Sequence, residues 1–276
     1  MIQDIYPHKL FNEYNPGLTA DEESIVICFR ESGVLIKEDL LPKVKDIKSL
    51  MVEELIYLFS VDGENKYFLL RNVEDIIVPE GYEFVSIKSL RSANFPKKYR
   101  IFVIYTAWQL ANWYANNKYC GRCGSPTYLD GSERAIRCSC GNVIYPRIVP
   151  AVIVGIKNGD RLLVTKYRQG YSHYALVAGF TEIGETLEET VSREVLEEVG
   201  LKVKNIRYYK SQPWGIADDL LAGFYCDVDG DDTIKMDEGE LKVAKWVGRD
   251  EIELQPEEFS LTNDMMKRFK DGLDNF

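Results

Sequence analysis

The feature that most constrains the fold of this chain is the stretch Gly179–Leu201. It reads as glycine, five residues, glutamate, seven residues, and then the run Arg-Glu-Val-Leu-Glu-Glu-Val-Gly-Leu. From Leu187 onward an apolar residue recurs at every fourth position, which is typical of an amphipathic helix with one buried side. Gly200 suits the left-handed position that ends such a helix. The stretch therefore predicts a loop followed by a helix that packs on a core.

Three glutamates crowd roughly one and a half turns of this helix: Glu194, Glu197 and Glu198. Like charges four residues apart destabilise a helix, so the cluster gives the fold no benefit. Hard carboxylate oxygens arranged in this way are the ligands that Mg²⁺ or Mn²⁺ takes, together with substrate phosphates. Arg193 can reach Glu197, and also Glu185 if the preceding loop folds back, which would hold the carboxylates ionised and oriented. We interpret the stretch as a metal site at the rim of the buried face.

The alternative interpretation of these glutamates is a solvated acidic helix face, which is what most charge runs are. That alternative does not account for seven specified positions over 22 residues, running from Gly179 through Glu185 to Gly200. The pattern is the complete Nudix box, so the segment resembles the Nudix hydrolases. The resemblance implies an enzyme that uses divalent cations to cleave a diphosphate linked to a nucleoside-like group.

Composition is consistent with a cytoplasmic enzyme. The 276 residues are enough for two domains, each with a core. No apolar run approaches the length of a membrane span, and the N-terminus does not have the pattern of a signal peptide, so we expect neither a membrane segment nor export. The net charge of −10 argues against a general nucleic-acid binder, which would need a basic stripe. An acidic protein that handles anionic substrates needs cations to offset its charge.

Six cysteines carry the second strong signal. Cys120 and Cys123 form one close pair, and Cys138 and Cys140 form a second pair after fourteen intervening residues. This arrangement predicts a small ribbon with a structural Zn²⁺, because four thiolates leave no open position for water. The second pair is separated by only one residue, where two are usual. Disulfides or a degenerate site are the alternatives; Cys28 and Cys226, which lie in apolar runs, are expected in the core.

These signals divide the chain into three parts: a Nudix-like α/β domain at 1–117, a zinc ribbon at 118–145, and a catalytic Nudix domain at 146–276. The overall fold class is α/β (α+β), with a mixed sheet between helices in the catalytic part. Hydrophobic patterns predict strands at 24–29, 54–59, 66–70, 148–156, 161–166, 203–211, 220–228 and 241–247. Beyond the box helix, further helices are predicted at 98–116 and 260–270.

The order of these parts narrows the resemblance. An N-terminal α/β domain, a four-cysteine ribbon, the segment Tyr145-Pro-Arg-Ile-Val-Pro and a Nudix box resemble the NADH pyrophosphatase (NAD⁺ diphosphatase) branch of the family. The tetrapeptide Ser-Gln-Pro-Trp at 211–214 opens a signature that the branch associates with dinucleotide specificity. Here the Pro-Phe-Pro that would follow is replaced by Gly215, Ile216 and Ala217, and Asp219 stands where the branch has a serine.

The resemblance also implies which residues act. Those implied in catalysis are Glu185, Arg193, Glu194, Glu197, Glu198 and Glu240. The last four are also the implied Mg²⁺ or Mn²⁺ ligands, and Glu198 or Glu240 is the candidate general base. Glu240 has an exposed acidic turn as its alternative role. Substrate contacts are implied for Tyr145, Ala178, Phe180, Ser211, Gln212, Trp214, Asp219 and Thr262. For Phe180 and Tyr145 the alternative is core packing.

Three functions compete at this point. The first is hydrolysis of NADH or NAD⁺ to nicotinamide mononucleotide and AMP, with release of the NAD cap from RNA 5′ ends, as the branch implies. The second is a Nudix hydrolase whose preference has shifted toward ADP-ribose or another nucleoside diphosphate derivative, which the altered 215–219 segment favours. The third is a Nudix-like binding protein without activity, which would not need to keep Glu197 and Glu198 together. Members of the branch are often homodimers, and the resemblance implies one here.

Overall fold

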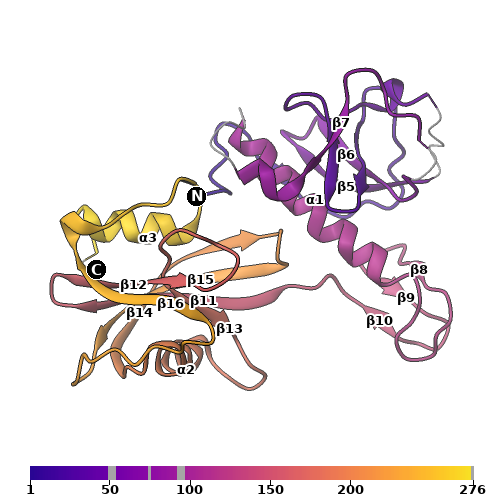
Figure 1. Ribbon diagram of the computed structural model, residues 1–276. Coiled ribbons are helices and arrows are strands. Elements are labelled where there is room, and N and C mark those ends of the chain that lie inside the picture. The colour runs from indigo at the N-terminus through magenta and orange to yellow at the C-terminus, as the bar shows by residue number, and fades with distance from the viewer. Residues whose placement is uncertain (49–53, 74–75, 92–96, 275–276) are drawn as a thin grey trace. The chain divides into compact units, whose positions relative to one another are not determined.

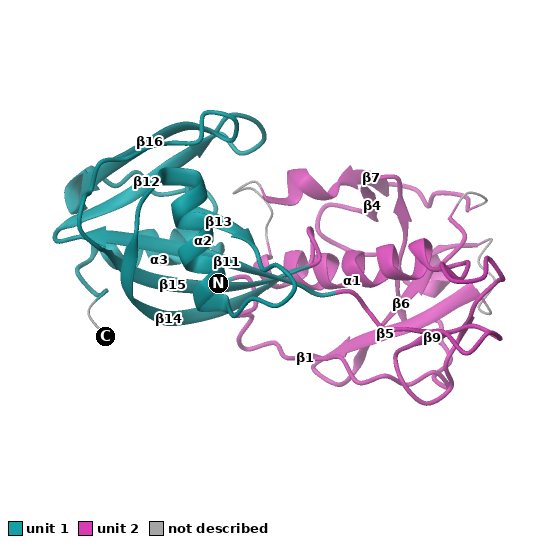
Figure 2. Cartoon of the chain, turned by 90° about the horizontal axis from the view of Figure 1, so that it is seen from below, with its two compact units in different colours: residues 1, 148–214, 219–276 teal, residues 2–147, 215–218 magenta. Residues whose placement is uncertain are grey.

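The computed structural model describes residues 1–48, 54–73, 76–91 and 97–274 (Figure 1). They form two compact units (Figure 2). Unit 1 comprises Met1 with residues 148–214 and 219–276, and unit 2 comprises residues 2–147 with 215–218. Unit 2 contains both the N-terminal part and the cysteine-rich segment, so the predicted boundaries at 117 and 145 stay predictions.

Unit 1 is built on one mixed sheet with a helix on each face (Figure 1). Its strands are β11 (Val149–Asn158), β12 (Arg161–Tyr167), β13 (Val177–Phe180), β14 (Val203–Trp214), β15 (Asp219–Val228) and β16 (Leu241–Gly248). The order is β14-β15-β11-β12-β16, with β13 paired to β11. Only β11 and β15 run parallel; the other pairs are antiparallel. The predicted α/β/α sandwich with a mixed sheet is confirmed.

Alternation along β11 explains why both faces of this sheet are covered. Val152, Val154 and Ile156 pack on the side of helix α2 (Leu187–Val199). Ile153, one position out of phase with them, packs on the side of helix α3 (Leu261–Lys270). Each helix therefore buries one apolar face of the same strand. A short 3₁₀ turn (Arg249–Glu251) connects β16 to the segment that leads into α3.

Helix α2 matches its predicted pattern. Val191, Val195 and Val199 are fully buried, and Leu187 packs against the same core. At its start, the Thr186 side chain accepts a hydrogen bond from the Glu189 backbone N–H, and the Glu189 carboxylate accepts one from Thr186 in return. Gly200 ends the helix with φ of +70°. Loop and helix boundaries are thus set by local sequence as well as by packing.

Unit 2 contains helix α1 (Lys98–Asn116) and three small sheets. One sheet has the order β1-β5-β6-β2 and the second β3-β4-β7. Their strands are β1 (Leu10–Phe11), β2 (Ile25–Ile27), β3 (Phe29–Arg30), β4 (Gly33–Ile36), β5 (Leu55–Val61), β6 (Asn65–Leu70) and β7 (Glu83–Ser86). Short 3₁₀ turns lie at Val44–Asp46 and Ile87–Arg91. The cysteine-rich segment forms the third sheet, with β8 (Tyr128–Leu129), β9 (Ile136–Arg137) and β10 (Val143–Ile144).

The prediction of a single strand at 24–29 is wrong. The chain splits there, because Ile25 to Ile27 pair with β6 while Phe29 pairs with Val34 in the other sheet. Cys28 lies between the two strands and is buried, as predicted, and so is Cys226.

Among the described residues, no helix combines the length and the apolar character that crossing a bilayer requires.

We predict that Gly155→Ala destabilises unit 1 by about 1–3 kcal/mol, because the space that the added methyl group would enter is already filled by another side chain. A Cβ at this position of β11 would lie 2.6 Å from a ring carbon of Tyr225, whose hydroxyl donates to the Met265 carbonyl of α3. Chemical denaturation measures the change in the free energy of unfolding. Gly248→Ala, which meets only an ordinary contact, is the control, and an equal effect in both variants would contradict the packing argument.

Candidate functional site

The three glutamates of α2 lie in three different environments. The side chain of Glu197 is 60% exposed and that of Glu194 is 13% exposed, whereas Glu198 as a whole residue is only 3% exposed. The helical periodicity explains this gradient, because Glu194 and Glu198 flank the buried stripe and Glu197 points away from it. The carboxylates therefore lie at the rim of the α2 core, as predicted.

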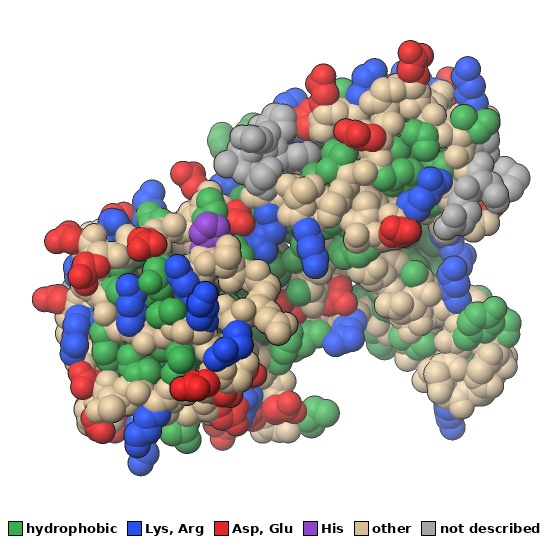
Figure 3. Space-filling model, viewed as in Figure 1, with side chains coloured by type: hydrophobic (Ala, Val, Ile, Leu, Met, Phe, Trp, Pro, Cys, Tyr) green, Lys and Arg blue, Asp and Glu red, His purple; other side chains and the backbone are tan. Residues whose placement is uncertain are grey.

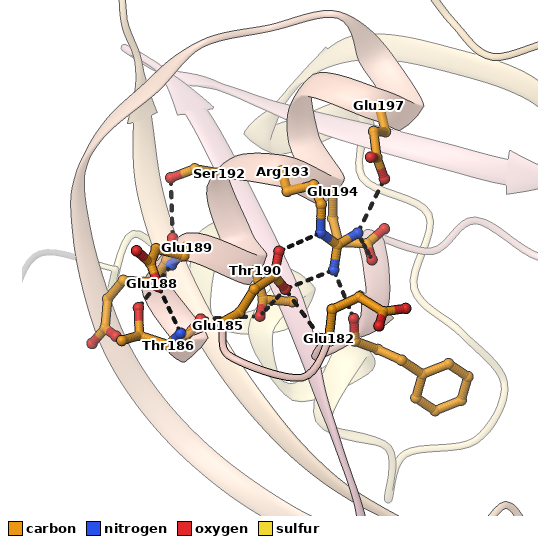
Figure 4. A network of polar contacts seen from close by, with 11 residues as sticks. Glu182, Glu185, Thr186, Glu188, Glu189, Thr190, Ser192, Arg193, Glu194 and Glu197 are labelled. Atoms are coloured by element: carbon orange, nitrogen blue, oxygen red, sulfur yellow. Dashed lines mark hydrogen bonds and ion pairs between the residues drawn. The ribbon is translucent and has the colours of Figure 1, made fainter.

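Arg193 connects these carboxylates to the loop before the helix (Figure 4). Its guanidinium donates from Nε and Nη2 to both oxygens of Glu185, at 2.6 and 2.9 Å. It also donates to Glu194 at 2.6 Å and to Glu197 at 3.0 Å. A further bond reaches the backbone carbonyl of Phe180 at 2.8 Å. The predicted fold-back of the loop onto Arg193 is present, and one guanidinium fixes β13, the loop and the helix together.

The electrostatic effect of Arg193 differs from one carboxylate to the next. The Arg193 guanidinium lowers the pKa of Glu185 to about 2, with help from the Glu182 N–H and the Thr190 hydroxyl. Burial nevertheless raises the pKa of Glu194 against the opposing effect of Arg193. The direction of the shift thus differs between the two partners of Arg193: the ion pair dominates at Glu185, and desolvation dominates at Glu194.

Glu198 is the most perturbed group of the site. Burial, followed by the charges of Glu194 and Glu240, raises its pKa to about 8. The backbone N–H of Ala178 stabilises its charged form, but its Oε2 is buried without a hydrogen-bond partner. A buried carboxylate oxygen with no donor is costly unless a cation faces it. The chemistry of these oxygen donors and this unsatisfied oxygen fit a divalent cation, although among the described residues only the cysteine cluster already has its ligand atoms gathered around one point.

Backbone hydrogen bonds position the segment that carries Glu240 at the end of α2. The segment before it binds the end of α2, since the Lys235 N–H donates to the Val199 carbonyl at 2.9 Å and the Asp237 N–H to the Glu198 carbonyl at 2.8 Å. These bonds satisfy carbonyls that a helix leaves open at its C-terminus. The Glu240 carbonyl in turn accepts from the Arg168 N–H at 2.9 Å. Its carboxylate is exposed, and its charge acts on the pKa of Glu194 and Glu198.

Gly179 sets the distance between β13 and α2. A Cβ at this position would lie 1.9 Å from the Cδ of Glu194, so no other residue fits without moving that carboxylate. The first glycine of the motif is therefore required for close approach, not only for loop freedom. Sequence analysis did not identify Tyr167 as a neighbour of these carboxylates. Burial raises the pKa of its phenol, and the charges of Glu198, Glu240 and Glu194 raise it further. No periodic or motif signal in the sequence marks it.

The four predicted cysteine ligands come together in unit 2. Their sulfur atoms all lie within 4.8 Å of one another, and among the described residues no other group of Cys, His, Asp or Glu has such a geometry. Cys120 Sγ lies 3.8 Å from Cys140 Sγ, and Cys123 Sγ lies 3.4 Å from Cys138 Sγ. Tetrahedral thiolates around one zinc would be about 3.8 Å apart, given Zn–S bonds of about 2.3 Å. All six cysteines are free, which excludes the disulfide alternative in this structure.

The short second pair does not prevent this geometry. Gly141 follows it with φ of +85°, and its N–H donates to the Cys138 carbonyl at 3.0 Å. On the other side, the Arg122 N–H donates to Cys120 Sγ at 3.4 Å and lowers the pKa of that thiol to about 6. A thiol whose pKa is lowered in this way is prepared to act as a thiolate ligand.

Several predicted substrate residues lie on unit 1 in suitable places. Phe180 ends β13 with its side chain 55% exposed, directly beside the carbonyl that Arg193 binds. Ala178, in the same strand, donates its N–H to Glu198. Thr262 lies in the first turn of α3 and is partly exposed. Their contacts with substrate stay predictions, and so does that of Tyr145, which is exposed in unit 2, where its hydroxyl donates to Glu133 at 3.1 Å.

The 211–214 tetrapeptide is the end of strand β14 rather than a loop. Gln212 is fully buried there, and its amide binds the start of α3: its Nε2 donates to the Phe259 carbonyl, and its Oε1 accepts from the Leu261 N–H, both at 2.8 Å. Trp214 packs near Phe259, with ring centroids 6.2 Å apart, while Ser211 is exposed. Asp219 is buried at the start of β15, and its implied contact with substrate stays a prediction.

Comparison with known proteins places this geometry in a wider context. Residues 146–269 match the NUDIX domain family. The NAD-capped RNA hydrolase NudC of Klebsiella pneumoniae (strain 342) is 45% identical over 153 residues, which cover 54% of this chain and 58% of the relative. That of Shigella dysenteriae serotype 1 is 44% identical over 152 residues, with the same coverage. The matched part thus spans little more than half the length of these curated relatives.

Among solved structures, a NUDIX hydrolase from Nitrosomonas europaea is similar, with a TM-score of 0.49 and 23% identity, covering 56% of this chain and 90% of that one.

We predict that Glu198→Gln removes a pH-dependent loss of stability. Because the pKa of Glu198 rises from 4.5 to about 8 on folding, the folded state binds more protons between these values, and the stability contributed by this group falls as pH rises through them. Without added divalent cations at pH 8, the variant should be more stable than the parent by on the order of 2 kcal/mol. Thermal and chemical denaturation at pH 5 and pH 8 measure the difference. Glu188→Gln, exposed on the same helix, controls for the lost charge, and equal pH profiles of parent and Glu198→Gln would contradict the assignment.

Proposed function

Because residues 146–269 form a NUDIX domain, we propose that this protein is an NAD(H) diphosphatase, which hydrolyses NADH or NAD⁺ to nicotinamide mononucleotide and AMP. The NAD-capped RNA hydrolases among its relatives support a second substrate, the NAD cap at RNA 5′ ends. The observation that carries the proposal is the set of rim carboxylates that Arg193 binds beside the buried, unsatisfied Glu198.

Glu194, Glu197, Glu198 and Glu240 are the residues that would hold Mg²⁺ or Mn²⁺. Bound divalent cations neutralise the diphosphate and lower the pKa of a coordinated water. The chain's own contribution is to orient these ligands. Arg193 fixes Glu194 and Glu197 from one side, and the backbone bonds of Lys235 and Asp237 carry Glu240 to the end of α2.

The reaction adds one water across the diphosphate. The water oxygen forms a bond to one phosphorus while the bond between that phosphorus and the bridging oxygen breaks, so the second phosphate leaves on its own nucleotide. A carboxylate takes the proton from water. Glu198 and Glu240 are the two candidates for this base.

We further propose that the four-cysteine cluster holds a structural Zn²⁺. Four sulfur ligands close the coordination shell, so its role is to stabilise the small sheet of β8, β9 and β10 rather than to act in chemistry. Free thiols of this kind suit the reducing cytoplasm, where we place the protein. A homodimer is the expected assembly, which light scattering tests.

A second candidate function is hydrolysis of ADP-ribose or a related nucleoside diphosphate. The observation in its favour is the 215–219 segment, which has lost the Pro-Phe-Pro of the branch and carries Asp219 in place of serine. A carboxylate in place of the serine would repel a phosphate that approaches it, but Asp219 is buried, which limits this effect. A binding protein without activity is disfavoured, because it would not need a buried carboxylate whose Oε2 lacks a donor.

We predict that Glu197→Gln and Glu198→Gln each lower turnover of NADH by ~100-fold or more with Mg²⁺ or Mn²⁺, because each removes a cation ligand or the base. The measurement is product formation, with thermal melting to show that the fold is kept. Glu188→Gln should retain full activity. Activity above about a tenth of the parent in both variants would refute the carboxylate assignment. Much faster turnover of ADP-ribose than of NADH or NAD⁺ would favour the second candidate.

We predict about one zinc per chain in protein purified without chelator. Replacing Cys120 and Cys123 together by serine should abolish zinc binding and lower the melting temperature, because the small sheet loses its cross-link. Elemental analysis and calorimetry measure both effects. Cys226→Ala, at a buried cysteine of unit 1 outside the cluster, should keep the zinc. Parent protein without zinc would refute the assignment.

A further inference from the structure

A cavity of about 330 Å³ lies on unit 1, beside the loop that follows β12. Its walls come from the end of β12, from the loop that leads toward β13, and from the start of β16. In Figure 3, basic side chains gather on the face of unit 1 that β16 crosses in Figure 1. The volume falls in the range of small-ligand pockets.

The charge of this cavity is opposite to that of the protein. The chain carries 44 acidic and 34 basic residues, yet the cavity is lined by Lys166, Arg168 and Lys242 and by no carboxylate. Within the part of the chain that the structure describes, none of these three side chains forms an ion pair. The carboxylate of Glu257, which accepts a hydrogen bond from the Tyr171 hydroxyl at 2.6 Å, is the negative charge next to the wall, and the three cations outnumber it. Three unneutralised cations around one cavity attract an anion.

One of these cations, Lys166, is held in place before any ligand arrives. The Lys166 ammonium lies 3.9 Å from the centroid of the Tyr174 ring, and that of Lys245 lies 4.8 Å from it. Tyr174 itself is fixed, because its carbonyl accepts from the Gln255 side chain at 2.9 Å. The next residue, Ala175, exchanges two backbone hydrogen bonds with Thr165 of β12, each 2.9 Å long. The loop is therefore tied down at the cavity wall, which lowers the entropic cost of binding.

The cavity adjoins the carboxylates of the proposed active site. Tyr167, which lines it, also packs into the core beneath α2, where the charges of Glu198 and Glu240 reach its phenol. The Arg168 N–H donates to the Glu240 carbonyl at 2.9 Å, and Lys242 follows Glu240 by two residues. The cavity wall and the segment that carries Glu240 are therefore joined through the main chain.

We propose that this cavity binds a phosphate group that the substrate carries in addition to its diphosphate. The inference rests on the proposed function, and it adds a specificity site to it. Two substrates offer such a group on the adenosine ribose: NADPH, through its 2′-phosphate, and NAD-capped RNA, through the first phosphodiester after the cap. The group is bound and not transformed, so the hydrolysis itself is unchanged.

The test compares NADH, which has no additional phosphate, with NADPH and with a short NAD-capped RNA. The variants are Lys166→Gln, Lys242→Gln and the double variant, and Lys267→Gln on the exposed side of α3 is the matched control. We expect each single variant to lower kcat/KM about tenfold for a substrate with the additional phosphate, mainly through KM, since one lost charge-assisted contact is worth about a factor of ten. The double variant should lower it further and leave NADH within about twofold.

The outcomes distinguish the two sources of the phosphate group, and they distinguish a failure of this inference from a failure of the proposed function. A selective loss for NADPH identifies the 2′-phosphate, a selective loss for capped RNA identifies the phosphodiester, and losses for both identify a site that serves either. An equal effect on all three substrates, or no effect, overturns the proposal. If the parent does not hydrolyse NADH, the proposed function fails, and calorimetry still decides the inference, with NADPH, capped RNA and NADH each titrated into the parent and the double variant. A loss of affinity confined to NADPH or capped RNA supports the inference, and an equal change, or no change, for all three ligands overturns it.

Discussion

The guanidinium of Arg193 is the interaction on which the candidate site depends. Through five hydrogen bonds it connects the end of β13, the loop that carries Glu185, and two carboxylates of α2. Lysine could not replace it, because a single ammonium cannot form the paired contact with Glu185 and still reach the Phe180 carbonyl. The geometry also keeps the loop closed over the start of the helix, so that the rim carboxylates are presented from a rigid element.

The surroundings of the carboxylates in this one short motif shift their pKa values in opposite directions. Glu185 is strongly paired and has a low pKa, whereas Glu198 is buried and has a raised one. Such separation is common where one group must keep its charge and another must exchange a proton. It also explains why repulsion within the helix is tolerated: the cost is offset by Arg193 on one side and, in the proposed active state, by cations on the other.

Much of this organisation could be predicted from the sequence. The valines of α2, the length of α1 and the apolar run of β11 are local patterns, and they predicted the right elements. The split at Cys28 and the strand β13 could not be predicted, because each depends on pairing with distant strands. For the site, motif spacing indicated Arg193 and the glutamates, whereas burial of Gln212 and Asp219 depends on how α3 and β15 pack. Whether a polar residue faces substrate or core is decided by tertiary structure, which a motif does not contain.

Backbone hydrogen bonds attach the 235–237 segment to the end of α2. Lys235 and Asp237 make these bonds with their backbone N–H groups, so the side chains at these positions are not needed for them. The path that brings Glu240 to the site is therefore encoded in chain length and backbone direction. Substitution of Lys235 would leave its backbone bond in place, whereas the insertion or loss of a single residue would displace the carboxylate. Proline at 235 or 237 is the substitution that the segment cannot accept, because proline has no N–H to donate.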